Sequence, residues 1–308
     1  MRIAHLSDLH LLDLEGAVPT RLLNKRLTGY ANLKLRRGHR HKPQPVVAAA
    51  RAMRDLGVDH VVITGDVSNL ALEREFDRVR ELLEGELGLS PDRVSLVPGN
   101  HDVYTSGSVR ARRFARWFEA YMKCDLPEIS GDHGYPFVHL RGPVAFVGLS
   151  TAVARPPFVA SGQLGREQLA RLERVVDHPE VRKRTVVVLQ HHPIHNPASW
   201  PKTLVEGLLD ARQEAKILSR LARGLVLHGH LHRRMNRALP TAEGVMHAVG
   251  ATSASMLHED EHRMAGFNLY EIDDAAGGVS RIEARRYHPE SGGFVETPVP
   301  VIHGAKSH

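Results

Sequence analysis

The residues best suited to chemistry lie in five short fragments. In the stretch from His228 to His232, two histidines, His230 and His232, lie two residues apart after a glycine. Imidazole nitrogens bind transition metals, but one such pair alone is more often structural. Four further fragments lie upstream: Asp8-Leu9-His10, Gly65-Asp66, Gly99-Asn100-His101-Asp102 and His191-His192-Pro193. Taken together, the five fragments predict one metal centre.

Each fragment directly follows a short apolar run that is rich in valine, isoleucine or leucine. Runs of this length and composition are typical of buried β-strands. The expected strands are Arg2–Leu6, His60–Thr64, Val94–Val97, Arg184–Leu189 and Leu225–Leu227. Open α/β sheets place their sites at the carboxyl ends of strands. We therefore expect the five fragments to meet at one edge of the protein.

Helical and strand patterns alternate through the first part of the chain, and the last third is rich in strands. The helices are expected at Pro45–Leu56, Leu72–Leu83, Val109–Met122, Arg166–Val176 and Leu204–Leu221. This order predicts an α/β protein, a four-layer α-β-β-α sandwich in which two mixed β-sheets are flanked by helices. We expect one domain over residues 1–308, with a basic insert at about 19–44 and an irregular tail from about Gly292.

The composition excludes several classes of protein. The chain has 308 residues, of which 42% are hydrophobic, so it can bury a large core. Its one cysteine, Cys124, excludes a disulfide framework and a CxxC zinc site. No apolar run approaches the roughly 20 residues of a membrane helix, and the chain begins with a strand instead of a signal peptide. We expect a cytoplasmic protein, whose net charge of +6 favours anionic partners.

The residues expected to bind metal combine neutral donors with only two carboxylates. They are Asp8, His10, Asp66, Asn100, His191, His230 and His232. Two divalent cations would leave this set with a net charge of about +2, which suits a phosphate ester. Mixed nitrogen and oxygen ligands favour Mn, Fe or Zn over Ca or Mg. Two such cations can orient a hydroxide and polarise phosphoryl oxygens.

In their order and residues, the five fragments resemble the motifs of the calcineurin-like, binuclear metallophosphoesterases: DxH, GD, GNH(D/E), H and GHxH. The resemblance covers about residues 2–250. It implies a first metal held by Asp8, His10, Asp66 and His232. It implies a second metal held by Asp66, Asn100, His191 and His230, with Asp66 as the bridge.

The resemblance also implies roles for residues that do not bind metal. His101 would stabilise the phosphate and protonate the leaving oxygen, which is typically worth about 10²–10⁴ in rate. Asp102 would orient His101 or close its loop. The family reads HxP in the fourth fragment, which selects His191 as the ligand and leaves His192 to line the substrate pocket or to fill space. Asn69 could touch the site or cap a helix. His228 is expected to end a buried strand as a core histidine.

The expected substrate is a phosphoester small molecule, by resemblance a nucleotide. Gly65–Ala71 and Gln190–Pro193 look most like the bacterial class III cyclic-nucleotide phosphodiesterases. Protein phosphatases of the superfamily carry GDxxDRG, whose second aspartate and arginine are missing here. The basic, leucine-containing segment Arg21–Lys42 could contact an anionic lipid, so a pyrophosphatase acting on a lipid-linked nucleotide such as UDP-diacylglucosamine is the alternative. A nuclease or a non-catalytic interaction module is less favoured, and strands within Val245–Tyr287 could pair across an oligomer.

Overall fold

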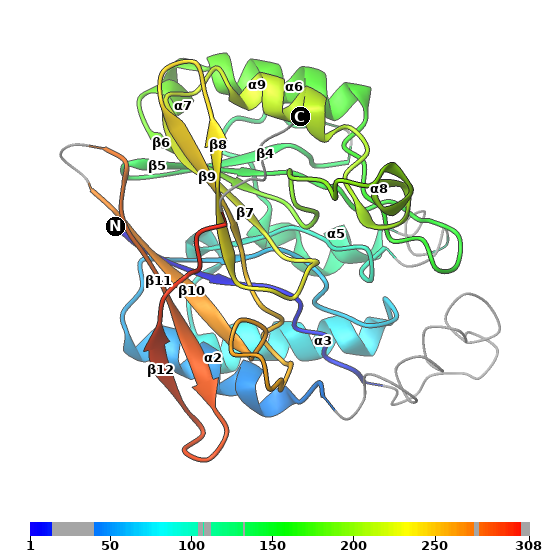
Figure 1. Ribbon diagram of the computed structural model, residues 1–308, viewed down its shortest axis with the longest axis vertical. Coiled ribbons are helices and arrows are strands. Elements are labelled where there is room, and N and C mark those ends of the chain that lie inside the picture. The colour runs from blue at the N-terminus through cyan, green and yellow to red at the C-terminus, as the bar shows by residue number, and fades with distance from the viewer. Residues whose placement is uncertain (14–39, 104–106, 108–111, 132, 274–276, 303–308) are drawn as a thin grey trace.

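The computed structural model describes residues 1–13, 40–103, 107, 112–131, 133–273 and 277–302. Two six-stranded sheets lie at the centre, with helices on the outer side of each (Figure 1). The predicted architecture of two mixed sheets flanked by helices is confirmed. Most of the basic segment Arg21–Lys42 lies outside the described residues.

The first sheet has the strand order β12-β11-β10-β1-β2-β3. Its strands are β1 Arg2–Leu6, β2 His60–Ile63, β3 Val94–Leu96, β10 Gly266–Ile272, β11 Val279–His288 and β12 Gly293–Thr297. β1, β2 and β3 are parallel, whereas β10, β11 and β12 pair antiparallel. The expected irregular tail from about Gly292 is wrong for Gly293–Thr297. This segment pairs with β11 because the Phe294 ring packs against Phe267 and Tyr287.

The second sheet has the order β4-β5-β6-β7-β9-β8. Its strands are β4 Phe137–Arg141, β5 Val144–Gly148, β6 Thr185–Leu189, β7 Arg223–His228, β8 Met235–Pro240 and β9 Val245–Gly250. β5, β6, β7 and β9 are parallel, and the edge strands β4 and β8 are antiparallel to their neighbours. In β6, Val187 and Leu189 join the core between the sheets, while Val186 and Val188 join the core under the outer helices. Burial on both faces explains the continuous apolar run of this strand.

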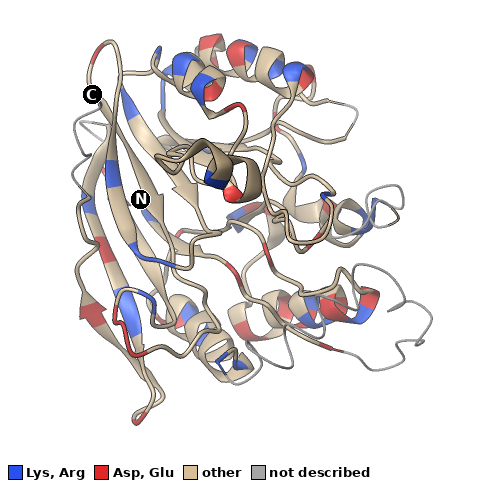
Figure 2. Ribbon diagram, turned by 45° about the vertical axis from the view of Figure 1, so that its right-hand side comes forward, with Lys and Arg blue, Asp and Glu red and all other residues tan. Residues whose placement is uncertain are grey.

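The α-helices form the two outer layers. They are α2 Pro43–Asp55, α3 Glu73–Glu81, α5 Arg113–Phe118, α6 Arg166–Asp177, α7 Pro179–Arg182, α8 Trp200–Glu206 and α9 Ala211–Leu218. Short helical turns occur at η3 Leu82–Leu87, η4 Pro91–Arg93 and η5 Glu119–Tyr121. Acidic and basic residues are interspersed along both layers (Figure 2). None of the helices in the described part of the chain is long and apolar enough to cross a membrane.

Two helix predictions differ from the structure. The expected helix Leu204–Leu221 is two helices, α8 and α9, because Gly207–Asp210 is held by contacts outside the helix. The Leu208 amide donates to the Asn196 side chain over 2.8 Å, and the Asp210 carboxylate accepts the amides of Leu164 and Gly165. The expected helix Val109–Met122 is described only from residue 112 onward, where α5 and η5 account for most of it.

Candidate metal centre

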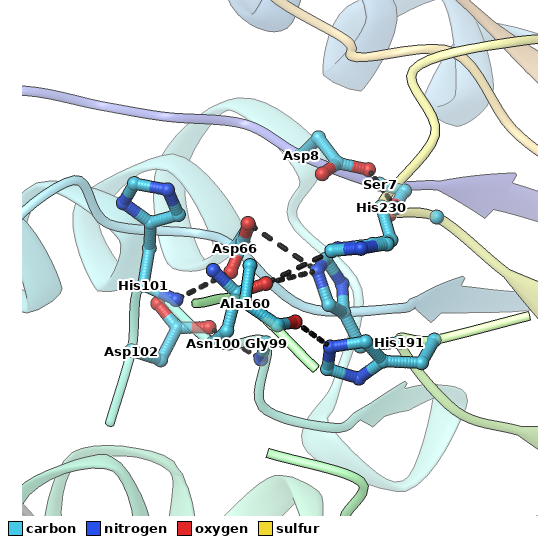
Figure 3. A network of polar contacts seen from close by, with 12 residues as sticks. Ser7, Asp8, Asp66, Gly99, Asn100, His101, Asp102, Ala160, His191 and His230 are labelled. Atoms are coloured by element: carbon cyan, nitrogen blue, oxygen red, sulfur yellow. Dashed lines mark hydrogen bonds and ion pairs between the residues drawn. The ribbon is translucent and has the colours of Figure 1, made fainter. Parts of the chain in front are cut away.

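The structure brings the five fragments together, because they follow β1, β2, β3, β6 and β7 at the same edge of the sandwich. Backbone hydrogen bonds connect them. The amide of Asp8 donates to the Gly65 carbonyl over 2.9 Å, and the amide of His10 donates to the Asp66 carbonyl over 3.0 Å. The side chains of Asp8, Asp66, Asn100, His191 and His230 therefore lie close together, as Figure 3 shows.

The backbone of the predicted ligands is unusual. Five of them have positive φ angles: Asp8 at 52°, His10 at 46°, Asp66 at 50°, His230 at 67° and His232 at 49°. Residues with a Cβ rarely adopt this left-handed region, and each instance costs about 1–3 kcal/mol. Such strain is concentrated at functional sites, where the surrounding fold holds it. Here it lets each strand end turn sharply, so that the side chain next to the turn faces the centre.

Two glycines of the fragments are required by close contacts. A Cβ on Gly99 would lie 2.1 Å from Oδ1 of Asp66, and a Cβ on Gly229 would lie 2.3 Å from Oδ2 of Asp8. Any other residue would displace these carboxylates. The glycines of the GNHD and GHxH fragments therefore let the carboxylates of Asp66 and Asp8 reach their positions.

The first ligand group contains Asp8, His10, Asp66 and His232. Nε2 of His10 and Nε2 of His232 face each other at 3.3 Å. Oδ1 of Asp8 is buried and lies 3.0 Å from the His232 nitrogen, and within the described part of the chain it has no hydrogen bond of good geometry. Oδ2 of Asp66 lies 4.0 Å from the His10 nitrogen. Among the described residues, ligand atoms of Asp8, His10 and His232 lie within 4.8 Å of one another, so a cation there would satisfy these three together, with Asp66 beside them.

The second ligand group contains Asp66, Asn100, His191 and His230. Nδ1 of His191 lies 2.8 Å from the Thr64 carbonyl, to which it must donate, so Nε2 carries the lone pair. That Nε2 faces Oδ1 of Asn100 at 3.2 Å and Oδ2 of Asp66 at 3.3 Å. When His191 is neutral, these three acceptors have no proton to share between them. The arrangement fits a cation, held as in the first group.

His230 completes the second group through its other ring nitrogen. Its Nε2 donates to the Glu206 carbonyl over 2.9 Å, so Nδ1 carries the lone pair and faces Oδ1 of Asn100 at 3.2 Å. Backbone carbonyls that fix the tautomer of a ligating histidine are a regular feature of metal sites. The residues present therefore fit divalent cations in two adjoining groups, Asp8-His10-His232 and Asp8-Asp66-His191, with Asn100 and His230 beside the second.

The pKa values agree with this assignment. Burial acts to raise the pKa of Asp66, but the nearby His191 and His101 hold it well below its usual value. Burial lowers the pKa of His230 to about 3, so its imidazole is neutral, as a ligand must be. Burial opposes protonation of His191, but Asp66 and Asp8 raise its pKa to about 9. In the absence of metal, a proton on His191 takes the place of the cation.

His101 lies beside the first group with one ring nitrogen fixed. Its Nδ1 donates to the Asn69 carbonyl over 2.8 Å, and its backbone amide donates to Oδ1 of Asp66 over 2.7 Å. The ring meets the His10 ring edge-on, with centroids 5.1 Å apart. Because Nδ1 donates to a carbonyl, Nε2 is the atom that can give or take a proton. His101 is half-buried.

Asp102 closes the loop between two fragments. Its carboxylate accepts hydrogen bonds from the amides of Ser68 and Gly99, both over 2.9 Å, and from the Ser68 hydroxyl over 2.8 Å. Burial and the nearby Asp66 raise its pKa to about 7. Of the two roles expected for Asp102, these contacts favour loop closure over the orientation of His101.

The structure places His192 and Asn69 among supporting residues. Nδ1 of His192 lies 2.8 Å from the Thr151 hydroxyl, its Nε2 donates to the Ala160 carbonyl over 2.7 Å, and the residue is 0% exposed. In this arrangement it has no exposed atom to offer a substrate. The Asn69 side chain donates to the His10 carbonyl over 2.7 Å, so it joins the loops that carry His10 and His101.

His228 and His41 complete the surroundings. His228 is the last residue of β7, is 1% exposed, and has a pKa lowered to about 4 by burial, as a core histidine should.

His41 was not predicted as a residue near the site. Its ring lies 4.9 Å from the His10 ring, measured between centroids. In the sequence it is the second histidine of Gly38-His39-Arg40-His41, at the end of the basic segment.

Comparisons with known proteins agree with the fold and the motifs. A model of the calcineurin-like phosphoesterase family matches residues 1–234. The solved structure of a dimetal phosphatase from Danio rerio is 16% identical in sequence to this chain, with a TM-score of 0.57. The match covers 92% of this chain and 95% of that one. A purple acid phosphatase from yellow lupin seeds is 11% identical over 97% of this chain and 53% of that one, with a TM-score of 0.59. At these identities the solved structures show the fold alone. The comparison with curated proteins gives no match.

Proposed function

Because this chain belongs to the calcineurin-like phosphoesterase family, we propose that it is a metal-dependent phosphodiesterase whose substrate is a nucleotide, in particular a cyclic one. The observation that carries the proposal is the pair of ligand groups that share Asp66, with the ring of His101 beside them. Only two carboxylates, Asp8 and Asp66, balance the cations. The centre would therefore keep a net positive charge of about +2, which favours a phosphoester.

The residues of the centre have distinct tasks. When bound, two divalent cations would lower the pKa of an attacking water and polarise the phosphoryl oxygens. His101 supplies the proton for the leaving oxygen from Nε2, because its Nδ1 is engaged with the Asn69 carbonyl. The Asp66 carboxylate accepts the His101 amide, so the bridging ligand and the proton donor are fixed relative to each other.

A diester is favoured over a monoester by the residues after Asp66. The protein phosphatases of the superfamily have a second aspartate and a phosphate-binding arginine there, whereas this chain has Asn69, Leu70 and Ala71. The Asn69 side chain donates to the His10 carbonyl, and Leu70 and Ala71 are buried. A second negative charge on the substrate would find no cationic side chain at these positions. A phosphodiester carries a single negative charge and needs none.

The test is hydrolysis of 3′,5′-cyclic AMP and of bis(p-nitrophenyl) phosphate by protein purified with Mn²⁺. We expect both to be cleaved, and Asp66→Asn to lose both activity and metal. We expect His101→Ala to lower kcat by about 10²–10⁴ on the cyclic nucleotide, since its alkoxide leaving group needs a proton. The loss on bis(p-nitrophenyl) phosphate should be smaller, because nitrophenolate leaves without one. Inactivity of the wild-type protein with Mn, Fe and Zn would refute the proposed function.

A second candidate is favoured by an apolar surface. Four large apolar residues are exposed on two neighbouring segments: Phe158 by 87%, Trp200 by 63%, and Leu204 and Val205 by 46% each. Exposed apolar groups of this kind mark contacts with ligands, membranes or other proteins. The alternative substrate is therefore a lipid-linked nucleotide such as UDP-diacylglucosamine, cleaved at its diphosphate.

This apolar surface is connected to the metal centre. The Ala160 amide donates to the Val205 carbonyl over 2.7 Å, which joins the two segments. The next carbonyl, that of Glu206, accepts the Nε2 proton of His230. An acyl chain on a bound substrate would thus have an apolar surface within the same segments. The test is the variant Trp200→Ser. If it no longer turns over a lipid-linked diphosphate but still hydrolyses bis(p-nitrophenyl) phosphate at the wild-type rate, the lipid-linked nucleotide is favoured over the cyclic nucleotide.

A further inference from the structure

A cavity of about 650 Å³ lies beside the loop that follows β3. Pro98 and Val103, which line this apolar cavity, flank the fragment Gly99–Asp102 on its two sides. Its other walls come from the loop after β5 and from the starts of α5 and α6. The volume lies within the range of pockets that bind small molecules. Neither the expected metal ligands nor His101 are among the described residues of its lining, so the cavity is separate from the candidate metal centre.

Much of the lining consists of hydrocarbon. The apolar residues that face the cavity include Pro98, Val103, Phe114, Ala152, Val153 and Leu164. Phe114 and Leu164 are 5% and 7% exposed, so they form deep parts of the wall and not its rim. A hydrocarbon group that enters such a cavity removes apolar surface from water on both sides of the contact.

Polar side chains of the lining are already bonded to the protein. The Gln168 amide accepts from the Ser150 amide over 2.8 Å and donates to the Ser150 carbonyl over 2.8 Å. It also donates to the Leu164 carbonyl over 3.1 Å. The Glu167 carboxylate lies 3.0 Å from the Arg171 guanidinium. A hydrocarbon group therefore suits this lining better than a nucleobase, whose polar ring atoms would need partners of their own.

A second, basic cavity of about 590 Å³ adjoins the first. Arg112 and His133 line both cavities, which therefore share a rim. Arg116 and Lys123 add two cations to the basic cavity, and Glu119 is the one carboxylate among the described residues that line it. Arginine and lysine side chains bind carboxylates and phosphates. The two cavities together match a molecule that has a hydrocarbon chain and an anionic head.

We propose that the two cavities form one binding site for an anionic amphiphile. Its aliphatic chain occupies the apolar cavity, and its head group contacts Arg112, Arg116 and Lys123. This site is distinct from the exposed apolar surface of Phe158 and Trp200, because neither residue lines the cavity. It also lies outside the ligand groups, so its occupation requires no metal and does not depend on the proposed function.

The test is calorimetry with hexanoate, octanoate and decanoate, on metal-free and on Mn²⁺-loaded protein. Burial of each methylene should improve affinity by about fourfold, so two added carbons should lower the dissociation constant by about 15-fold until the cavity is full. 1-Decanol, which has the same chain without the charge, should bind more weakly than decanoate. Affinity should be the same with and without Mn²⁺. Tighter binding of decyl phosphate than of decanoate would identify a lipid phosphate as the head, and weaker binding a fatty acid.

Variants of the lining locate the chain and the head. Ala152→Phe, in the loop after β5, and Ala115→Phe, on α5, each place a ring in the apolar cavity, and both alanines are half-buried. Either variant should abolish the gain in affinity from octanoate to decanoate. Arg116→Gln should weaken decanoate by about 10-fold but preserve that gain. The matched control is Ala242→Phe, at an exposed alanine between β8 and β9, which should bind as the wild type does, and so should Trp200→Ser.

Each other result would overturn the proposal. Equal affinities along the series would exclude a buried chain. If the folded alanine variants keep the gain from octanoate to decanoate, or if Trp200→Ser loses it, the chain lies elsewhere. Equal binding of decanoate and 1-decanol would remove the role of the cations. Binding that requires Mn²⁺ would place the head group at the metal centre. Because Ala152 and Ala115 lie on different walls, a Tm near the wild-type value in either variant is enough for the test.

Discussion

Replacement of Gly99 by alanine tests the position of the bridging carboxylate. The new Cβ would lie 2.1 Å from Oδ1 and 2.4 Å from the amide nitrogen of Asp66, whereas Cβ atoms are essentially never found closer than 3.0 Å to such atoms. Asp66 or the Gly99 loop must therefore move by about 1 Å. A displacement of this size at a reacting centre can lower the rate by about 100-fold. Since Asp66 belongs to both ligand groups, the binding of both metals should also weaken.

The assay is kcat for bis(p-nitrophenyl) phosphate together with metal content by mass spectrometry. We expect Gly99→Ala to lose about 100-fold or more in kcat and to hold less than two metals per chain. The control is Gly85→Ala, since a Cβ there has nothing within 4 Å and replaces a glycine within a helical turn. That control should keep full activity and gain about 0.5–1 kcal/mol of stability. Two bound metals and wild-type kcat in Gly99→Ala would refute the proposed geometry of Asp66.

Three other predictions concern buried groups. In metal-free protein the pKa of His191 is raised above its unfolded value to about 9. The protonated His191 therefore stabilises the folded protein, and this contribution should be lost as the pH rises from 6.5 to 9. Because His191 must lose its proton to bind metal, metal affinity should increase over the same range, and calorimetry at several pH values would measure both effects. Burial raises the pKa of Glu214 to about 8, so thermal stability should fall between pH 4.5 and 8, and Glu214→Gln should flatten that fall. His192→Ala should lose about 2–4 kcal/mol of stability without raising KM. A raised KM with an unchanged Tm would instead support His192 as a substrate contact.

The sequence predicted the sheets and the convergence of the candidate metal ligands because both depend on local patterns. Each fragment directly follows an apolar run, and a parallel strand buried on both faces consists of such a run. β6 shows this most clearly, since all five of its residues are buried. The polar fragment after β6 then lies beside the fragment after β7, because the two strands are parallel neighbours. The convergence of the fragments follows from the order of the strands.

Long-range contacts explain what the sequence did not predict. The apolar periodicity of Leu204–Leu221 is compatible with one helix. The helix is interrupted where Asn196 binds the Leu208 amide and Asp210 accepts the amides of Leu164 and Gly165. His41 is near His10 because Ser255 holds it, and these two residues are 214 positions apart. No pattern within a short window contains either contact. Such residues are found only when the fold is known.

The assignment of roles to individual ring nitrogens also requires the fold. Three histidines of the centre have a tautomer fixed by a backbone carbonyl: His191 by Thr64, His230 by Glu206 and His101 by Asn69. Every residue carries a carbonyl, so the sequence gives no sign of which ones accept these protons. The carbonyls direct the lone pairs of His191 and His230 toward the second ligand group and leave Nε2 of His101 outside it. The motifs therefore select the side chains, whereas the turns that follow the strands decide which ring nitrogens face the candidate metal centre.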